Sequence, residues 1–186
     1  MNYALIREND IANGPGVRTS LFVSGCRHHC KGCFNPETWN FNYGSLFTQN
    51  EIDQIIQATE PSFVDGLTLL GGEPLEPENQ EGLIELLKQF KQKLPNKTVW
   101  CYSGFSFEND LLPKIHNNIE HIKELLSLVD VLVDGKFVEE LKSSALLFRG
   151  SSNQNIIDVK QSISKNKMVL LPGKWERKMG SGNIYE

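Results

Sequence analysis

The 186-residue chain has only four cysteines, and no run of about 20 apolar residues that would be needed to cross a membrane. Its first residues show no basic stretch leading into a long apolar one, so we expect no secretory leader and a cytoplasmic protein. Neither charge dominates, because 19 basic residues are interspersed with 23 acidic ones. This mild balance gives no indication of a nucleic-acid or membrane partner.

Length and composition instead predict one globular domain. Hydrophobic residues make up 39% of the chain and charged residues 23%, which is ordinary for a folded protein. No internal repeat is present. We expect residues 1–171 to form the domain and residues 172–186 to form an exposed or flexible tail.

Strand and helix patterns alternate along the chain, which predicts an α/β fold. Helical spacing of apolar residues occurs over 83–94 and 119–126, and Thr48 to Glu51 form a capping box that should begin another helix. The predicted strands are 17–23, 67–70, 98–102 and 129–133, with one or two more at 146–148 and 155–159.

Four to six such units are too few to close an ordinary eight-stranded barrel. We therefore expect a partial, open (β/α) barrel with a mostly parallel sheet. Ligands gather at the carboxyl ends of parallel strands. The cysteine-rich loop, Gly71-Gly72-Glu73-Pro74 and Ser103-Gly104 all follow predicted strands, so we expect them to converge on one face.

Three of the four cysteines lie in one loop, as Cys26-x-x-x-Cys30-x-x-Cys33. Cytosolic thiols are kept reduced, which favours metal ligands or redox groups over disulfides. Three thiolates can hold three irons of a cubane cluster and leave the fourth iron open. Zinc with His28 or His29 as fourth ligand is less consistent, because structural zinc sites usually take ligand pairs from two separated segments. A redox dithiol leaves Cys26 unexplained, so we rank it third.

The segment Gly71-Gly72-Glu73-Pro74 is by itself a common kind of strand-ending turn. Next to an open iron it has a second interpretation. Glycine allows close backbone approach to a ligand, and carbonyl or carboxylate oxygens accept hydrogen bonds from an ammonium group. We favour this second interpretation because of the neighbouring cysteines.

Together these motifs resemble the radical S-adenosylmethionine superfamily. The three cysteines and the segment 71–74 resemble its general pattern, and Asn13-Gly14-Pro15-Gly16-Val17-Arg18 resembles the glycyl-radical-enzyme activases. The resemblance extends to Val159. Three further stretches resemble the activating proteins of anaerobic ribonucleoside-triphosphate reductases, namely 33–39, 131–137 and 149–154.

The resemblance implies a reaction and its partners. An open iron of the 4Fe–4S cluster would bind S-adenosylmethionine, whose reductive cleavage gives a 5′-deoxyadenosyl radical. That radical would remove hydrogen from a glycine in the large glycyl radical subunit of the reductase. The reductant would be a low-potential electron donor such as flavodoxin.

The resemblance also implies site residues. Cys26, Cys30 and Cys33 would hold the cluster, and Phe34 would replace the aromatic residue that commonly packs on adenine. It assigns no catalytic acid, base or nucleophile. The full set of cofactor-binding residues that it implies is Gly71, Gly72, Glu73, Ser103, Phe34 and Asp134.

Three other interpretations stay open. The chain could activate another glycyl radical enzyme, of the formate-lyase type, although the additional cysteine motifs of those activases are missing here. It could be a small radical enzyme acting on a deazapurine precursor. From a different class, it could be a zinc-stabilised binding module without catalysis.

For several other residues we expect a structural role. His28 and His29 are expected to be solvated, and Cys101 to be a small buried apolar residue. Arg18 is expected either to bind an anion near the site or to pair with a surface carboxylate.

Overall fold

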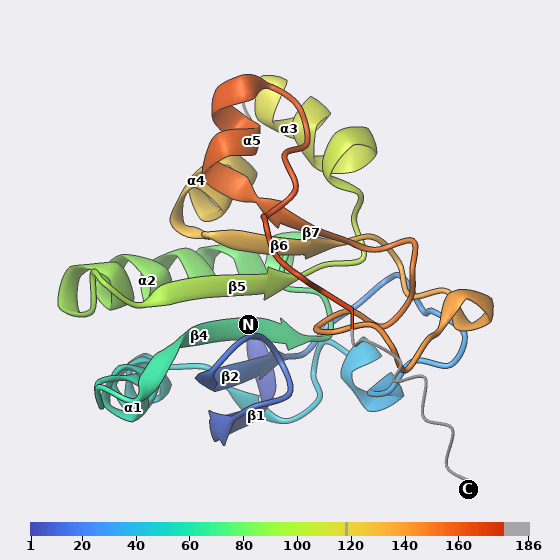
Figure 1. Ribbon diagram of the computed structural model, residues 1–186. Helices are drawn as coiled ribbons and strands as arrows, with labels where there is room; N and C mark the ends of the chain where they lie inside the picture. Colours follow the sequence, from blue (N-terminus) through green and yellow to red (C-terminus); the bar gives the residue numbers. More distant parts are fainter. Residues whose placement is uncertain (118, 177–186) are drawn as a thin grey trace, which may run out of the picture.

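The computed structural model describes residues 1–117 and 119–176. One open sheet of seven strands runs through it in the order β3-β1-β2-β4-β5-β6-β7 (Figure 1). The strands are β1 Asn2–Asp10, β2 Val17–Val23, β3 Ser45–Leu46, β4 Val64–Gly71, β5 Thr98–Tyr102, β6 Val131–Asp134 and β7 Asn155–Asp158.

The sheet is mixed. The pairs β2–β4, β4–β5 and β5–β6 are parallel, whereas β1–β2, β1–β3 and β6–β7 are antiparallel. The α/β class and the open sheet are confirmed, but the expectation of a mostly parallel sheet is wrong. The strand directions follow from the connections between the strands. Each parallel pair is joined by a helical crossover, whereas only loops and a short 3-10 helix lie between β6 and β7, so β7 returns antiparallel to β6. The strand predicted at 146–148 is absent, and that segment has only an isolated bridge to Glu176.

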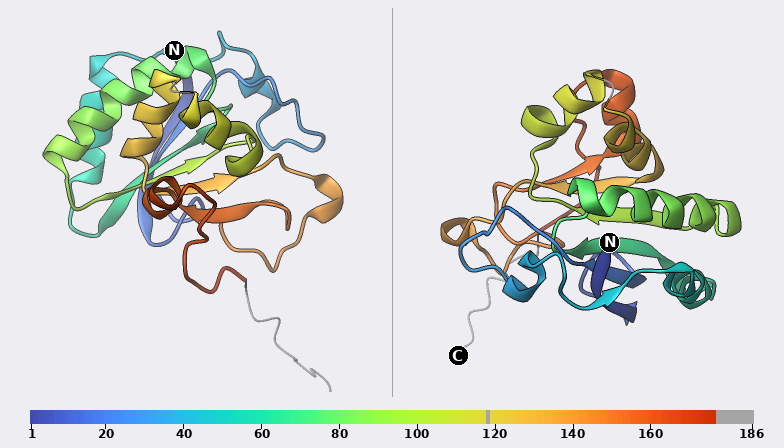
Figure 2. Two further views of the ribbon diagram at one scale, coloured as in Figure 1. Left: turned by 90° about the horizontal axis from the view of Figure 1, so that it is seen from above. Right: turned by 180° about the vertical axis from the view of Figure 1, so that it is seen from behind.

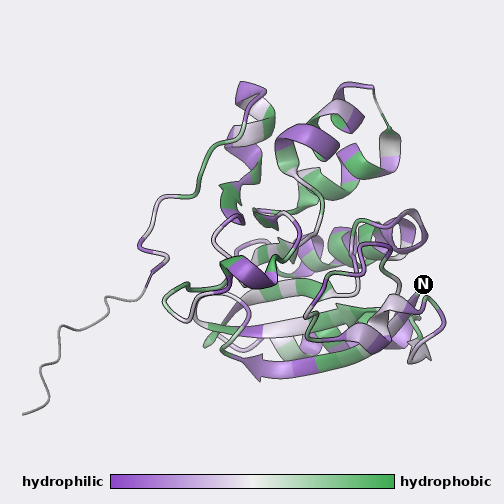
Figure 3. Ribbon diagram, turned by 90° about the vertical axis from the view of Figure 1, so that its right-hand side faces the viewer, coloured by the Kyte–Doolittle hydropathy of each residue, from purple (hydrophilic) through white to green (hydrophobic). Residues whose placement is uncertain are grey.

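The helices are α1 Gln49–Thr59, α2 Pro77–Lys93, α3 Leu112–His116, α4 Glu120–Leu128 and α5 Val159–Lys165. The predicted capping box begins α1, with the Thr48 N–H donating to Glu51 Oε2 at 2.6 Å. Figure 2 shows α1, α2 and α4 together on one face of the sheet. Both hydrophobic and hydrophilic residues occur along these helices (Figure 3), as expected when one side packs on a sheet. No described helix combines the length and apolar character needed to cross a membrane.

The main core lies between the helices and the sheet. Alternate strand residues point into it, among them Leu21, Leu69 and Cys101, all fully buried. Cys101 is therefore the buried apolar residue that we expect. The opposite face carries a smaller cluster around Trp100 and Val133. Within the described ranges, strand and loop residues rather than helices make up this second cluster, and a cavity opens on the same face.

Arg18 departs from expectation. Its side chain is buried at the start of β2, where it donates from Nε to Thr68 Oγ1 at 2.7 Å and from Nη2 to the carbonyls of Leu67 and Thr98, each at 2.9 Å. Burial lowers the pKa of Arg18 to about 10, so the guanidinium stays charged at neutral pH. The prediction of an anion site or a surface ion pair is wrong, because hydroxyl and carbonyl oxygens from neighbouring strands satisfy this charge.

Candidate functional site

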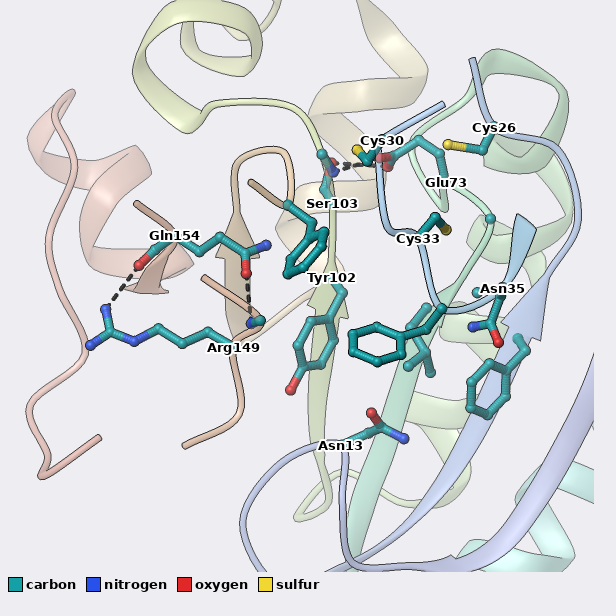
Figure 4. A pocket seen from close by; sticks show the side chains of 18 of the residues that line it. Asn13, Cys26, Cys30, Cys33, Asn35, Glu73, Tyr102, Ser103, Arg149 and Gln154 are labelled. Atoms are coloured by element: carbon teal, nitrogen blue, oxygen red, sulfur yellow. Dashed lines mark hydrogen bonds between the residues drawn. The ribbon is translucent and has the colours of Figure 1, made fainter. Parts of the chain in front are cut away.

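A cavity of about 670 Å³ opens on the face of the sheet away from α1 and α2 (Figure 4). The loops that follow β2, β4 and β5 contribute to its lining. The predicted convergence of these loops is confirmed. Of the predicted site residues, those that line the cavity are Cys26, Cys30, Cys33, Phe34, Gly71, Gly72, Glu73 and Ser103.

The three cysteines of the loop are free thiols around one end of this cavity. Cys26 is buried and Cys30 and Cys33 are half-buried, and burial raises the pKa of Cys26 to about 11 and raises that of Cys30 as well. The Cys33 N–H donates to the Cys30 carbonyl at 3.2 Å, which makes a tight turn. Three soft sulfur donors facing one cavity suit an iron–sulfur cluster. No three His, Cys, Asp or Glu side chains in the described ranges are placed to hold a single metal ion.

Gly71 and Gly72 bring the end of β4 against the cysteine loop. Gly71 has a φ of +109°, and a Cβ there would lie 2.7 Å from Phe22 Cα. A Cβ on Gly72 would lie 2.6 Å from the Gly25 carbonyl oxygen. That oxygen accepts the Glu73 N–H at 2.8 Å. Both glycines are therefore required by close backbone contact, and they set the position of the residue that precedes Cys26.

The carboxylate of Glu73 joins three loops. It is almost fully buried, and its Oε1 accepts hydrogen bonds from Ser103 Oγ and the Leu75 N–H, both at 2.9 Å. Its Oε2 accepts from the Gly104 N–H at 2.7 Å and lies 3.0 Å from His28 Nε2. A carboxylate offers about four acceptor positions, so the protein itself occupies them all. The main contribution of Glu73 is to hold the walls of the site together.

His28 is not the solvated residue that we expect. Its half-buried ring contacts Glu73 and meets the Phe105 ring edge-on, with centroids 4.6 Å apart. Gly104 leaves space for it, because a Cβ at that position would lie 2.4 Å from His28 Cδ2. His29 is exposed as predicted, and its ring stacks on Trp39 at 4.5 Å. The cysteine loop is thus held by His28 against Glu73 and Phe105, and by His29 against Trp39.

Arg27 provides another attachment for the same loop. Its N–H donates to Glu76 Oε1 at 2.8 Å, and its Nη1 donates to Glu76 Oε2 at 2.5 Å. Glu76 is buried just before α2. The segment from 26 to 33 is therefore tied to the ends of β4 and β5 and to the start of α2.

Phe34 and Asp134 have different positions relative to the cavity. Phe34 lies at the rim with 72% of its surface exposed, and its ring is 5.9 Å from that of Phe137. Asp134 is buried and does not line the cavity. Its Oδ2 accepts the Phe107 N–H at 2.7 Å and its Oδ1 accepts the Asn155 N–H at 3.1 Å, so it joins the loop after β5 to β7.

Sequence reasoning missed several cavity residues on the strands themselves. Phe22, Leu70 and Tyr102 lie side by side on β2, β4 and β5 and point into the cavity. The two-residue periodicity of the strands could have found them, since each is out of phase with the core residues beside it. The cavity also extends to the loops around Asn13 and Phe148.

Comparison with known proteins places the chain among iron–sulfur proteins. A family model described as a 4Fe-4S single cluster domain matches residues 12–157. A protein of Enterobacteria phage T4 is 41% identical over 84% of this chain and 93% of its own length. Proteins of Escherichia coli K12 and Haemophilus influenzae are 40% and 39% identical, over 83% and 84% of this chain and 96% and 97% of theirs. All three are named anaerobic ribonucleoside-triphosphate reductase-activating protein.

Proposed function

Because the chain belongs to the family of anaerobic ribonucleoside-triphosphate reductase-activating proteins, we propose that it activates such a reductase by radical S-adenosylmethionine chemistry. A bound 4Fe–4S cluster would supply the electron for reductive cleavage of S-adenosylmethionine to methionine and a 5′-deoxyadenosyl radical, and this radical would take hydrogen from a glycine Cα of the reductase. A low-potential carrier such as flavodoxin is the electron donor in this scheme. The open sheet would be the partial barrel typical of these enzymes.

The observation that carries the proposal is the cavity, which has three free thiols at one end and the Gly71 to Glu73 segment beside them. Cys26, Cys30 and Cys33 would hold three irons, and the absence of a fourth cysteine in the loop would leave one iron for the cofactor. Gly71 and Gly72 would allow the methionine end to approach the backbone. Glu73 and Ser103 would fix the loops around it.

Phe34 would pack on the adenine from the rim of the cavity. Asp134 is not part of the proposed cofactor site, because its hydrogen bonds go to Phe107 and Asn155, outside the cavity. The remaining length of the cavity, toward Asn13 and Phe148, would receive the glycine segment of the reductase. Together with the bound segment, these walls would limit the access of water to a radical that attacks most C–H bonds.

The proposal is tested by anaerobic incubation of the reconstituted protein with S-adenosylmethionine, dithionite and an anaerobic ribonucleotide reductase. Electron paramagnetic resonance should detect a glycyl radical on the reductase, and 5′-deoxyadenosine should accumulate. A glycyl radical enzyme of the formate-lyase type serves as the alternative partner in a parallel sample. A radical on that enzyme and none on the reductase would assign the chain to the other activase class, and stoichiometric zinc without cofactor cleavage would favour the binding module.

A further inference from the structure

Residues 167–176, here called the C-terminal strap, lie beyond the family match that ends at residue 157. The strap leaves α5 and runs back along β7, with the Asp158 N–H donating to the Val169 carbonyl at 2.9 Å and the Leu171 N–H to the Ile156 carbonyl at 2.8 Å (Figure 1). Much of the predicted tail, residues 177–186, lies outside the described residues. Within the strap, residues 172–174 are exposed, but Trp175 is half-buried.

Trp175 packs on the face of the sheet that holds the cavity. Its ring meets Trp100 edge-on at 5.9 Å and Phe148 edge-on at 6.2 Å, and Trp100 and Phe148 meet each other at 6.1 Å. The indole Nε1–H donates to the Leu171 carbonyl at 3.0 Å, which fixes the ring relative to the strap. Three mutually edge-on aromatic rings form a directional packing unit as well as an apolar one.

The strap also binds the loop 146–150 through polar contacts. The Leu147 N–H donates to the Trp175 carbonyl at 2.9 Å, and Arg149 Nη2 lies 3.0 Å from Glu176 Oε1. Leu147, Phe148 and Arg149 all line the cavity, whereas Trp175 and Glu176 do not. The strap therefore touches the back of a cavity wall.

The backbone of this wall is strained at one residue. Phe148 has a φ of +55°, a left-handed conformation that bulky side chains rarely adopt and that persists only where the surroundings hold it. The contacts on both sides of Phe148, to the Trp175 carbonyl and to Glu176, come from the strap. Figure 4 places Arg149 across the pocket from the three cysteines, around which the proposed cofactor site is built.

We propose that the C-terminal strap positions the loop 146–150 and thereby sets the fit of the reductase's glycine segment in the cavity, with Trp175 as the positioning residue. This inference rests on the proposed function for its partner. The strap acts through Phe148 and Arg149, because these two residues face the cavity. The cofactor end of the cavity, built from the cysteine loop and Glu73, has no contact with Trp175 among the described interactions.

The test compares Trp175→Ala with Lys174→Ala, an exposed neighbour in the same strap, and with Trp175→Phe, which keeps an aromatic ring. Glu176→Gln is a milder variant that weakens only the ion pair with Arg149. It is used in place of Trp175→Ala if that variant does not fold. In protein without reductase, amide hydrogen exchange of residues 146–150 should become faster in Trp175→Ala and stay unchanged in Lys174→Ala. This readout does not depend on the reaction, so it tests the strap even if no glycyl radical is formed with any partner.

The second readout, the KM for the reductase, distinguishes a positioning role of Trp175 from a general loss of enzyme activity. We expect the KM for the reductase to rise on the order of tenfold in Trp175→Ala, while 5′-deoxyadenosine formation without reductase changes less than about twofold. Trp175→Phe should recover most of the loss, and Glu176→Gln should show a smaller rise in KM. Unchanged exchange of 146–150, an unchanged KM, or an equal loss in both assays would overturn the proposal.

Discussion

His28 Nε2 lies 3.0 Å from Glu73 Oε2, so a residue inside the cysteine loop is joined to the segment that follows β4. The same carboxylate binds Ser103 and Gly104 after β5. One buried side chain thus fixes the relative positions of three loops that come from distant parts of the chain. The cysteines form no disulfide, so the position of the cysteine loop, and with it the shape of the cavity, depends on non-covalent contacts such as this network.

We predict that Glu73→Gln loosens the site. The new amide group replaces one acceptor oxygen by a donor, so two of the four existing donors lose their partner. The free energy of unfolding should fall by about 1.5–3 kcal/mol, the range for hydrogen bonds to a buried charged group. Chemical denaturation measures this change, and calorimetry should show weaker binding of S-adenosylmethionine to the reconstituted protein.

Glu81→Gln is the matched control for this change, because Glu81 is exposed on α2. Its free energy of unfolding should stay within about 0.5 kcal/mol of the wild type. Equal stability and equal cofactor binding in Glu73→Gln and Glu81→Gln would show that the four hydrogen bonds do not organise the site.

We predict that Gly72→Ala prevents stable incorporation of the cluster. The added Cβ would lie 2.6 Å from the Gly25 carbonyl oxygen, so the backbone before Cys26 must move. Iron content after anaerobic reconstitution, measured per chain, should fall well below that of the wild type. Gly82→Ala is the control, since it lies within α2 and meets only the flexible side chain of Met1. Wild-type iron content in Gly72→Ala would mean that this contact is not needed.

The ion pair between Lys91 and Asp130 should make stability depend on pH. Burial by itself raises the pKa of Asp130, but hydrogen bonds from Lys91 Nζ at 2.5 Å and the Val99 N–H at 2.8 Å outweigh it and hold the pKa below its ordinary value of 3.8. The folded protein then binds fewer protons here than the unfolded chain. This contribution to stability is present above the unfolded pKa and is lost as the pH falls through the folded pKa.

Asp130→Asn should therefore lower the free energy of unfolding by about 1.5–3 kcal/mol at pH 7. The difference from the wild type should become smaller as the pH falls below about 4, where the unfolded chain takes up a proton first, and then through the lower pKa of the folded protein. Urea unfolding at pH 7 and at pH 3 measures both values, with the exposed Asp53→Asn as control. A difference that stays constant over this range would contradict the assigned role of Asp130.

The predictable parts of the fold are those with local signals. The β-favouring run of β2 lies between glycines, and the capping box at Thr48 acts over three residues. By contrast, β1 includes several charged and polar residues and is half-exposed, so its sequence lacks the apolar run of a buried strand. The burial of Arg18 was not predictable, because its partners Thr68 and Thr98 are 50 and 80 residues away along the chain.

The candidate site divides in the same way. The spacing of the three cysteines within one loop predicts them as cluster ligands without any tertiary information. By contrast, the contact of His28 with Glu73 joins residues that are 45 positions apart in the sequence. The packing of Trp175 on Trp100 likewise joins the C-terminal strap to the distant strand β5. Such contacts depend on which strands are neighbours in the sheet, and no local sequence pattern specifies this order.

The central claim is that Cys26, Cys30 and Cys33 hold one cluster with an open iron, while Cys101 has no part in it. Iron and acid-labile sulfide per chain after anaerobic reconstitution test this most directly. We predict about four of each for the wild type and for Cys101→Ala, whose thiol is buried in the core on the helix side. We predict loss of the stable cluster in Cys30→Ala. Full iron and sulfide content in Cys30→Ala, or a single zinc in the wild type, would contradict the account.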